Sequence, residues 1–380
     1  MRILFFVSSM HAGGAERVAA TLASAWAARG DTVALVPTYT GRGDCFYPLH
    51  GDVRLQWLAD QMGSLGRKFC PPLAKWLAMR RLVRDFRPDV IVSFLTNVNV
   101  MVLLATHKLG VPVIVSERTN PAFSTSAGAV LRRLRNWTYP WASKVVLQSR
   151  DSVASFRTMA PHIQQEKLAV MPNPMPADMP EARTGPRVPA AERPRLMAMG
   201  RLVASKRFDT LIQAFASLAK TFPDWDLVIW GEGPLRAQLE AQVTALGLDE
   251  RVQLPGRTEQ PWDALRQADV FALVSAVEGF PNVLLEAMAL GCACVTVDCP
   301  SGPREITQHG QFAELVPLGD QQALQDAMAR LMCDPVLRDA MGRRAAGSVR
   351  QHYGIAQILA RWDALFESIG RSHRESMNDQ

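Results

Sequence analysis

The sequence of 380 residues has few cysteines and no long uninterrupted apolar run. Its six cysteines form no CxxC pair and no cluster with histidine at the spacing of a zinc site, which argues against a disulfide framework and a structural metal. The apolar run at 3–7 is too short for a signal peptide, and the run at 98–105 is far short of the ~20 residues that span a bilayer. We therefore expect a cytoplasmic protein without a transmembrane helix.

Acidic residues are scarce in the first half of the chain. Residues 1–180 hold 21 Lys and Arg against 11 Asp and Glu, whereas residues 181–380 hold 21 against 25. The basic residues mix with aromatic ones in two clusters, at 67–84 and 132–141. This mixture is typical of proteins that bind anionic headgroups, so we expect an anionic membrane surface as a partner; solvated faces of ordinary helices are the alternative. No nucleic-acid-binding module is recognisable, and nucleic acid is not expected as a partner.

Short apolar runs alternate with segments of helical period along the whole chain. With 48% hydrophobic and 21% charged residues, the composition excludes disordered and fibrous classes. The alternation predicts an α/β protein with parallel sheets covered by helices on both faces. We expect strands at 3–7, 33–36, 53–57, 90–94, 113–116, 144–147, 167–171, 195–199, 227–230, 252–254, 270–274, 293–297 and 313–316. We expect helices at 15–28, 72–86, 99–109, 282–290, 320–332, 335–351 and 355–369.

A proline-rich stretch divides the chain into two domains. Residues 172–194 contain seven prolines, which can continue neither periodicity. The sequence therefore predicts one doubly wound domain at 1–171, a linker at 172–194, a second such domain at 195–352, and a C-terminal helix and tail at 353–380. Because such sheets bind ligands at the carboxyl ends of their strands, we expect the site in a cleft between the two domains.

In the first half, Gly13 and Gly14 follow the first strand and open a helix. Unobstructed backbone N–H groups at a helix N-terminus could receive an anion such as the phosphate of an acceptor. A purely steric role at a tight corner is the alternative.

In the second half, Gly200 and Arg201 end a strand, and Lys206 follows in the same loop. Two cations there could bind a diphosphate leaving group whose charge grows as a bond breaks. In the alternative reading, Arg201 pairs with a domain-closing carboxylate and Lys206 is merely solvated.

Two carboxylates lie eight positions apart around a predicted helix start. Glu278 is in the loop after a strand, and Glu286 is about one turn inside the following helix. Both could accept hydrogen bonds from sugar hydroxyls, beside exposed backbone amides. These amides are those of Gly279, Phe280, Asn282 and Val283. Alternatively, Glu286 is a satisfied core carboxylate and Glu278 is a capping charge.

Taken in order, these residues resemble the family 4 retaining glycosyltransferases over nearly the whole chain. The matching motifs are Gly13-Gly14-Ala15-Glu16-Arg17-Val18, Gly200-Arg201 with Lys206, Gly231-Glu232-Gly233-Pro234, Glu278 with Glu286, Gly291, and Ser301-Gly302-Pro303-Arg304-Glu305. The resemblance implies a GT-B fold, with two Rossmann-like domains facing across a cleft. It also implies that the first domain binds the acceptor, the second binds a nucleotide sugar, and the C-terminal helix crosses back to the first.

The resemblance implies a role for each candidate residue. Arg201 and Lys206 would hold the donor diphosphate, Glu278 would contact hydroxyls of the donor sugar, and Glu286 would hold the ribose. Gly14, with Gly13, would let a phosphate approach the first domain. The remaining donor contacts would be Gly200, Gly279, Phe280, Asn282 and Val283. No metal and no cofactor are implied, and we interpret Asp224-Trp225-Asp226 as the start of a strand rather than as a metal-binding string.

One position departs from the family pattern. Many members carry a histidine in the loop after the fifth strand, where this chain has Glu117 and Arg118. Either residue could orient a hydroxyl or a phosphate, and a buried structural pair between them is the alternative.

Together these features predict a retaining transfer of a hexose or N-acetylhexosamine from a nucleotide diphosphate sugar, such as a UDP-sugar. The basic first half favours a polyprenyl-diphosphate glycan as acceptor, at the inner face of the cytoplasmic membrane. The alternatives are a GT-B-like sugar-nucleotide epimerase or phosphorylase, and a non-catalytic scaffold that binds nucleotide sugar or polyprenyl phosphate.

Overall fold

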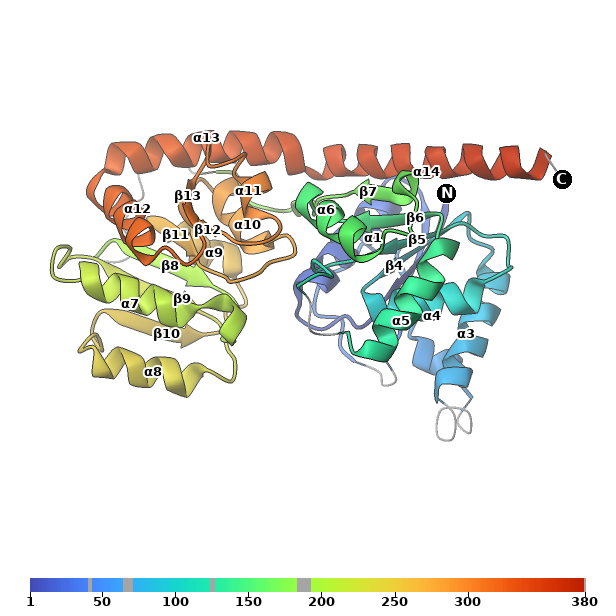
Figure 1. Ribbon diagram of the computed structural model, residues 1–380, viewed down its shortest axis with the longest axis horizontal. Helices are drawn as coiled ribbons and strands as arrows, with labels where there is room; N and C mark the ends of the chain where they lie inside the picture. The colour runs from blue at the N-terminus through green and yellow to red at the C-terminus, as the bar shows by residue number, and fades with distance from the viewer. Residues whose placement is uncertain (40–42, 64–70, 124–126, 183–192, 379–380) are drawn as a thin grey trace. The chain divides into compact units, whose positions relative to one another are not determined.

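The computed structural model describes residues 1–39, 43–63, 71–123, 127–182 and 193–378, with side chains up to residue 370 (Figure 1). The chain divides into two compact units. Unit 1 comprises Met1–Ala177 together with Ile355–Gln380, and unit 2 comprises Asp178–Gly354. The division falls inside the proline-rich stretch, of which residues 183–192 lie outside the described residues.

Unit 1 contains a parallel sheet of seven strands in the order β3-β2-β1-β4-β5-β6-β7. Its strands are β1 (Arg2–Val7), β2 (Thr32–Pro37), β3 (Arg54–Leu55), β4 (Val90–Phe94), β5 (Val113–Ser116), β6 (Lys144–Leu147) and β7 (Leu168–Val170). Its helices are α1 (Gly14–Ala28), α3 (Pro71–Phe86), α4 (Thr96–Thr106), α5 (Ala129–Thr138), α6 (Arg150–Met159) and α14 (Ile355–Asn378).

Unit 2 repeats this topology with six parallel strands in the order β10-β9-β8-β11-β12-β13. Its strands are β8 (Arg195–Met199), β9 (Asp226–Trp230), β10 (Val252–Gly256), β11 (Val270–Leu273), β12 (Ala293–Asp298) and β13 (Glu314–Pro317). Its helices are α7 (Phe208–Leu218), α8 (Arg236–Ala245), α9 (Pro261–Arg266), α10 (Asn282–Ala289), α11 (Pro303–Ile306), α12 (Gln321–Cys333) and α13 (Pro335–Tyr353). The predicted α/β class with two doubly wound sheets is confirmed.

The alternation of side chains along β1 explains why helices cover both faces of the first sheet. Leu4 and Phe6 pack into one buried apolar cluster, with α3 and α4. Ile3 and Phe5 pack into another, with α1 and α14. After its first residue, Arg2, β1 is apolar at every position and buries both of its faces, as parallel strands between two helical layers do.

Three predicted elements differ most in extent from the structure. The strand expected at 53–57 shortens to β3, an edge strand that pairs with β2 at two positions only. The helix expected at 99–109 begins three residues earlier, because the backbone turns at Leu95, whose φ is +77°, directly after β4. The last helix continues past residue 369 to Asn378.

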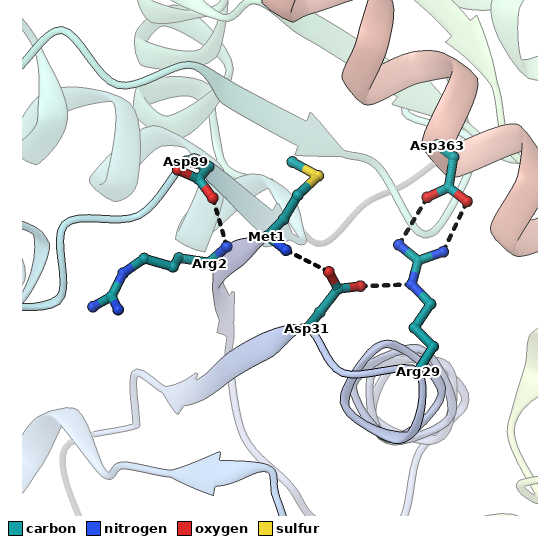
Figure 2. A network of polar contacts seen from close by, with 6 residues as sticks. All are labelled: Met1, Arg2, Arg29, Asp31, Asp89 and Asp363. Carbon is teal, nitrogen blue, oxygen red and sulfur yellow. Dashed lines mark hydrogen bonds and ion pairs between the residues drawn. The ribbon is translucent and has the colours of Figure 1, made fainter.

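The last helix, α14, packs against α1 in unit 1. The rings of Trp26 and Trp362 meet edge to face with centroids 5.6 Å apart, and Phe366 contacts both. Figure 2 shows the polar contact beside them, in which the Arg29 guanidinium donates two hydrogen bonds of 2.8 Å to the Asp363 carboxylate.

Among the described residues, no helix combines the length and the apolar character that crossing a membrane requires.

Candidate active site

The strand order of unit 2 reverses direction between β8 and β11, which are neighbours in the sheet. In doubly wound sheets, ligands bind outside the carboxyl ends of the strands at such a point. The loop after β8 carries Gly200, Arg201 and Lys206, and the loop after β11 carries Glu278. The two loops touch, since the Ala276 N–H donates a hydrogen bond of 2.8 Å to the Ser205 carbonyl.

Lys206 and Glu278 form an ion pair across these two loops. The side chains are 23% and 10% exposed, so both are partly desolvated while remaining open to solvent. The Arg201 side chain is exposed and, among the described residues, contacts no carboxylate. Lys206 is therefore not merely solvated, as the alternative expected. One cation is held in place by a carboxylate, and the other is available to a ligand.

Two glycines let the loop after β9 lie against the loop after β8. A Cβ at Gly231 would overlap the carbonyl oxygen of Gly200, and one at Gly233 would overlap that of Leu202. The Leu202 N–H donates a hydrogen bond of 2.9 Å to the Glu232 carbonyl across this contact. These glycines thus serve close backbone packing that shapes the loop carrying Lys206.

The turn between Glu278 and α10 is supported by the loop after β12. The Glu278 N–H donates a hydrogen bond of 3.3 Å to the Pro300 carbonyl, and a Cβ at Gly302 would lie 2.6 Å from Pro281 Cδ. Helix α10 begins directly after Pro281. The N–H groups of Gly279 and Val283 have no hydrogen-bond partner among the described residues. They are donors that an anion at this helix start could use.

Glu286 lies inside α10, among residues of the core. Its carboxylate is buried, like the neighbouring Leu285 and Ala287 side chains. The structure thus brings Lys206 and Glu278 into contact, and it places Glu286 in the helix that the Glu278 loop starts. Phe280 is also buried in that loop, whereas Asn282 is half-buried at the first position of the helix.

In unit 1, the turn at Gly13 and Gly14 was expected to carry unobstructed backbone N–H groups, and the structure differs at Gly13. The Gly13 N–H donates a hydrogen bond of 3.1 Å to the Tyr47 hydroxyl, so this amide is not unobstructed. The Glu16 carboxylate accepts a hydrogen bond of 2.9 Å from Ser9 Oγ, and a Cβ at Gly13 would overlap it. The φ of Gly13 is −169°, a conformation open to any residue, so a side chain at this position would mainly have to displace the Glu16 carboxylate.

Glu117 follows β5 and is buried within a polar network. Its carboxylate accepts hydrogen bonds from the Tyr139 hydroxyl and, at 2.8 Å, from Thr96 Oγ1. Asn99 Nδ2 donates to the same Tyr139 hydroxyl at 2.9 Å. Burial raises the pKa of Glu117 above its usual value, and the two hydrogen bonds only partly oppose this.

Arg118 is a buried cation in the same loop, 7% exposed. Its guanidinium lies 4.2 Å from the centre of the Phe94 ring and donates hydrogen bonds to Asn173 Oδ1 and, at 3.5 Å, to Ser116 Oγ. Burial lowers the pKa of Arg118 to about 9. In the described part of the chain, no carboxylate pairs with Arg118, so the expected alternative of a Glu117–Arg118 pair is wrong.

The sequence pattern did not reveal Tyr139, Thr96 and Asn173. The mixture of basic and aromatic residues at 132–141 predicted a surface that includes Tyr139, but Tyr139 and Arg135 are buried. Arg132, Arg133 and Trp137 of that cluster are exposed. Residues 67–70 of the other cluster lie outside the described residues.

The Asp224-Trp225-Asp226 string lies away from the candidate site. Asp226 is the first residue of β9, at the opposite end of the sheet from Lys206. Its carboxylate accepts hydrogen bonds of 3.3 Å from both Arg251 and Arg193. The string therefore has a local structural role.

Each half of the chain matches the model of a known protein family. Residues 13–174 match the family model described as "Glycosyl transferase 4-like domain", and residues 186–347 match "Glycosyl transferases group 1".

Two curated relatives and one solved structure illustrate the similarity. The chain is 27% identical over 97% of its length, and 99% of the relative's, to a GalNAc-alpha-(1->4)-GalNAc-alpha-(1->3)-diNAcBac-PP-undecaprenol alpha-1,4-N-acetyl-D-galactosaminyltransferase of Campylobacter jejuni. It is 37% identical, over 40% of each chain, to an N-acetylgalactosamine-N,N'-diacetylbacillosaminyl-diphospho-undecaprenol 4-alpha-N-acetylgalactosaminyltransferase of the same organism. The structure of Anabaena HepE in complex with UDP and glucose superimposes with a TM-score of 0.79, covering 97% of this chain and 100% of that one at 21% identity.

Proposed function

Because the chain belongs to the family 4, or group 1, glycosyltransferases, we propose that it transfers a hexose or N-acetylhexosamine from a UDP-sugar to a polyprenyl-diphosphate-linked glycan. The chain is therefore a glycosyltransferase with the GT-B fold, as the sequence resemblance implied. The proposed acceptor is supported by the undecaprenol-linked substrates in the names of the two Campylobacter relatives, and the proposed donor by the UDP in the HepE complex.

The observation that carries the proposal is the Lys206–Glu278 ion pair at the carboxyl ends of β8 and β11. Glu278 holds the Lys206 ammonium in place before any ligand arrives, so its charge needs little reorganisation during the reaction. We propose that Lys206 and Arg201 bind the donor diphosphate and stabilise the charge that grows on it as the glycosidic bond breaks. Glu278 accepts hydrogen bonds from hydroxyls of the donor sugar.

We propose that the sugar is transferred with retention of configuration. In this mechanism the acceptor oxygen attacks the anomeric carbon from the face that the nucleotide diphosphate leaves. The leaving phosphate takes the proton of the acceptor hydroxyl, so no protein nucleophile is needed. Catalysis then rests on positioning and electrostatic stabilisation.

The remaining contacts to the donor come from the residues around α10. The N–H groups of Gly279 and Val283 suit phosphate oxygens at the helix start, with Phe280 and Asn282 in the same turn. Glu286 is proposed to hold the ribose, and Gly200 to let the diphosphate approach the backbone.

In unit 1 we propose Arg118 as the phosphate-binding residue for the acceptor. Within the described part of the chain, the buried Arg118 guanidinium has no carboxylate partner, and such a cation attracts an anion strongly, because little water screens it. Glu117 has no such role in this account, since its carboxylate is used by Tyr139 and Thr96. Gly14 remains a candidate for a close phosphate contact at the start of α1.

We propose that unit 1 docks on an anionic membrane through α3 and α5. Leu77 and Arg81 are exposed one turn apart on α3. On α5, Val130 and Trp137 are 72% and 58% exposed, with Arg133 exposed between them. Exposed apolar side chains beside arginines fit the boundary between headgroups and acyl chains at the inner face of the cytoplasmic membrane.

We propose that transfer needs no metal ion, since Arg201 and Lys206 can supply the positive charge at the diphosphate. Transfer measured in excess EDTA should stay within about twofold of the untreated rate. A loss of activity that added Mg²⁺ or Mn²⁺ restores would contradict this.

The function is tested by incubating the purified protein with polyprenyl-diphosphate glycans and a panel of UDP- and GDP-sugars. We expect a mass gain of one hexose or N-acetylhexosamine on the lipid, matched by release of nucleotide diphosphate. Interconversion of the nucleotide sugar without lipid would indicate an epimerase. Binding of the nucleotide sugar without either product would indicate a scaffold.

A further inference from the structure

The last residue of α13, Tyr353, contacts the loop that carries Glu278. Its ring and the ring of Phe280 meet edge to face, with centroids 5.5 Å apart and planes at 63°. Both side chains are buried. Phe280 lies between Glu278 and the start of α10, so the contact joins the end of one helix to the centre of the candidate donor site.

A second contact ties Tyr353 to the segment behind the same loop. The Tyr353 hydroxyl donates a hydrogen bond of 3.2 Å to the carbonyl of Glu305 in α11. Gly302, directly before α11, lies under the loop, where a Cβ would be 3.2 Å from Phe280 Cα. Phe280 is therefore held by the Gly302 backbone and by the Tyr353 ring.

Contacts along helix α13 hold the helix, and with it Tyr353, against neighbouring parts of unit 2. Gly342 lies so close to the loop after α10 that a Cβ there would overlap the Gly291 carbonyl. Near the other end of the helix, Arg350 Nη2 donates hydrogen bonds to the carbonyls of Pro180 at 2.6 Å and Ala289 at 3.4 Å. The end of α13 is thus attached both to α10 and to the first residues of unit 2.

We propose that Tyr353 is a positioning residue for donor binding, an inference that rests on the proposed function. Through Phe280 it holds the backbone of 278–283 in the conformation in which Glu278 meets Lys206 and the Gly279 and Val283 amides are ready for phosphate. The chain leaves unit 2 at Gly354, directly after Tyr353. Tyr353 therefore contacts the donor loop from the end of the last helix of unit 2.

The proposal is tested with Tyr353→Leu, which removes the ring, and Tyr353→Phe, which removes only the hydroxyl. Phe215→Leu is the matched control, because Phe215 is also a buried ring of unit 2 and lies near the end of α7. The first measurement is amide hydrogen exchange across 278–284 in the ligand-free protein. We expect Tyr353→Leu to accelerate it about tenfold, the size of one aromatic contact, and the other two variants to stay near the parent.

The second measurement is the KM for the nucleotide sugar in the transfer reaction. It should rise about tenfold in Tyr353→Leu, recover in Tyr353→Phe, and leave the KM for the lipid acceptor unchanged. Unchanged exchange in Tyr353→Leu, or equal acceleration in Phe215→Leu, would overturn the proposal. If Tyr353→Leu does not fold, Phe280→Leu must give the same acceleration. A parent protein without transfer activity would refute the proposed function, while the exchange measurement would still decide the role of Tyr353.

Discussion

At the scale of single residues, the proposed chemistry depends on charges that the fold holds in unfavourable surroundings. Arg118 is buried against Phe94, no carboxylate of the described residues pairs with it, and burial lowers its pKa to about 9. Such a group costs stability, because a buried charge loses its hydration. The cost is understandable if the group is kept for binding an anion.

Arg118→Met should therefore reduce transfer without harming the fold. We expect kcat/KM to fall at least about tenfold, because one phosphate contact is lost, while the melting temperature is unchanged or higher. Arg157→Met, which removes an exposed arginine of the same unit, is the control and should change neither value. A threefold or smaller loss in kcat/KM for Arg118→Met would contradict the assignment.

Glu117 should make the stability of unit 1 depend measurably on pH. Its pKa is raised by burial, so the folded state holds the proton more tightly than the unfolded chain, whose value is 4.5. The stability that this bound proton contributes is fully present below pH 4.5 and declines as the pH rises through the higher pKa of the folded state. Glu117→Gln keeps an acceptor for Tyr139 and cannot ionise. The melting temperature of Glu117→Gln minus that of the parent should increase from pH 5 to pH 8. A difference that stays constant with pH would refute this.

The sequence predicted part of this site, for clear physical reasons. Lys206 and Glu278 each follow a strand of a parallel sheet, and the carboxyl ends of neighbouring strands lie together, so their proximity could be predicted from order alone. The partners of Glu117 could not. Tyr139 stands among arginines and tryptophans, a pattern of surfaces, and only tertiary packing turns it inward.

At the scale of elements, α14 is the part of unit 1 that comes from the far end of the chain. Its apolar residues recur at helical spacing, and this pattern predicted the helix itself. The length of the strand expected at 53–57, now β3, was overestimated. An edge strand pairs on one side only, and the sequence pattern does not reveal where pairing stops.

The docking of α14 should depend on its aromatic contacts far more than on its ion pair. Trp362→Ala should lower the free energy of unfolding of unit 1 by about 3–5 kcal/mol, since it removes a fully buried ring from Trp26. Asp363→Ala should cost about 1 kcal/mol or less, because Asp363 and Arg29 are 41% and 31% exposed. Denaturant titrations of both variants check this order, and equal losses would contradict it.

At the scale of the whole molecule, the two units share a strand order but differ in charge. The excess of basic residues lies in the first half of the chain, and exposed arginines of α3 and α5 belong to it. This asymmetry supports a division of labour in which unit 1 meets an anionic lipid surface and the diphosphate of the acceptor.

The charge of α5 should control binding to membranes. Arg132→Glu/Arg133→Glu should reduce flotation with vesicles rich in anionic lipid about tenfold or more, and raised salt should weaken binding of the parent. Arg343→Glu/Arg344→Glu makes the same change of charge on exposed positions of α13 and should leave flotation near the parent. Equal losses in the two variants would show that net charge, rather than the α5 surface, governs binding.

The most direct test of the account is the kcat/KM of sugar transfer by Lys206→Ala, measured beside Lys220→Ala as a control on an exposed lysine. If the Lys206–Glu278 pair is the donor centre, Lys206→Ala should lower kcat/KM about a hundredfold or more, because a charge that stabilises the leaving diphosphate is gone. Lys220→Ala should behave as the parent. A Lys206→Ala variant within a few-fold of the parent would contradict the central claim.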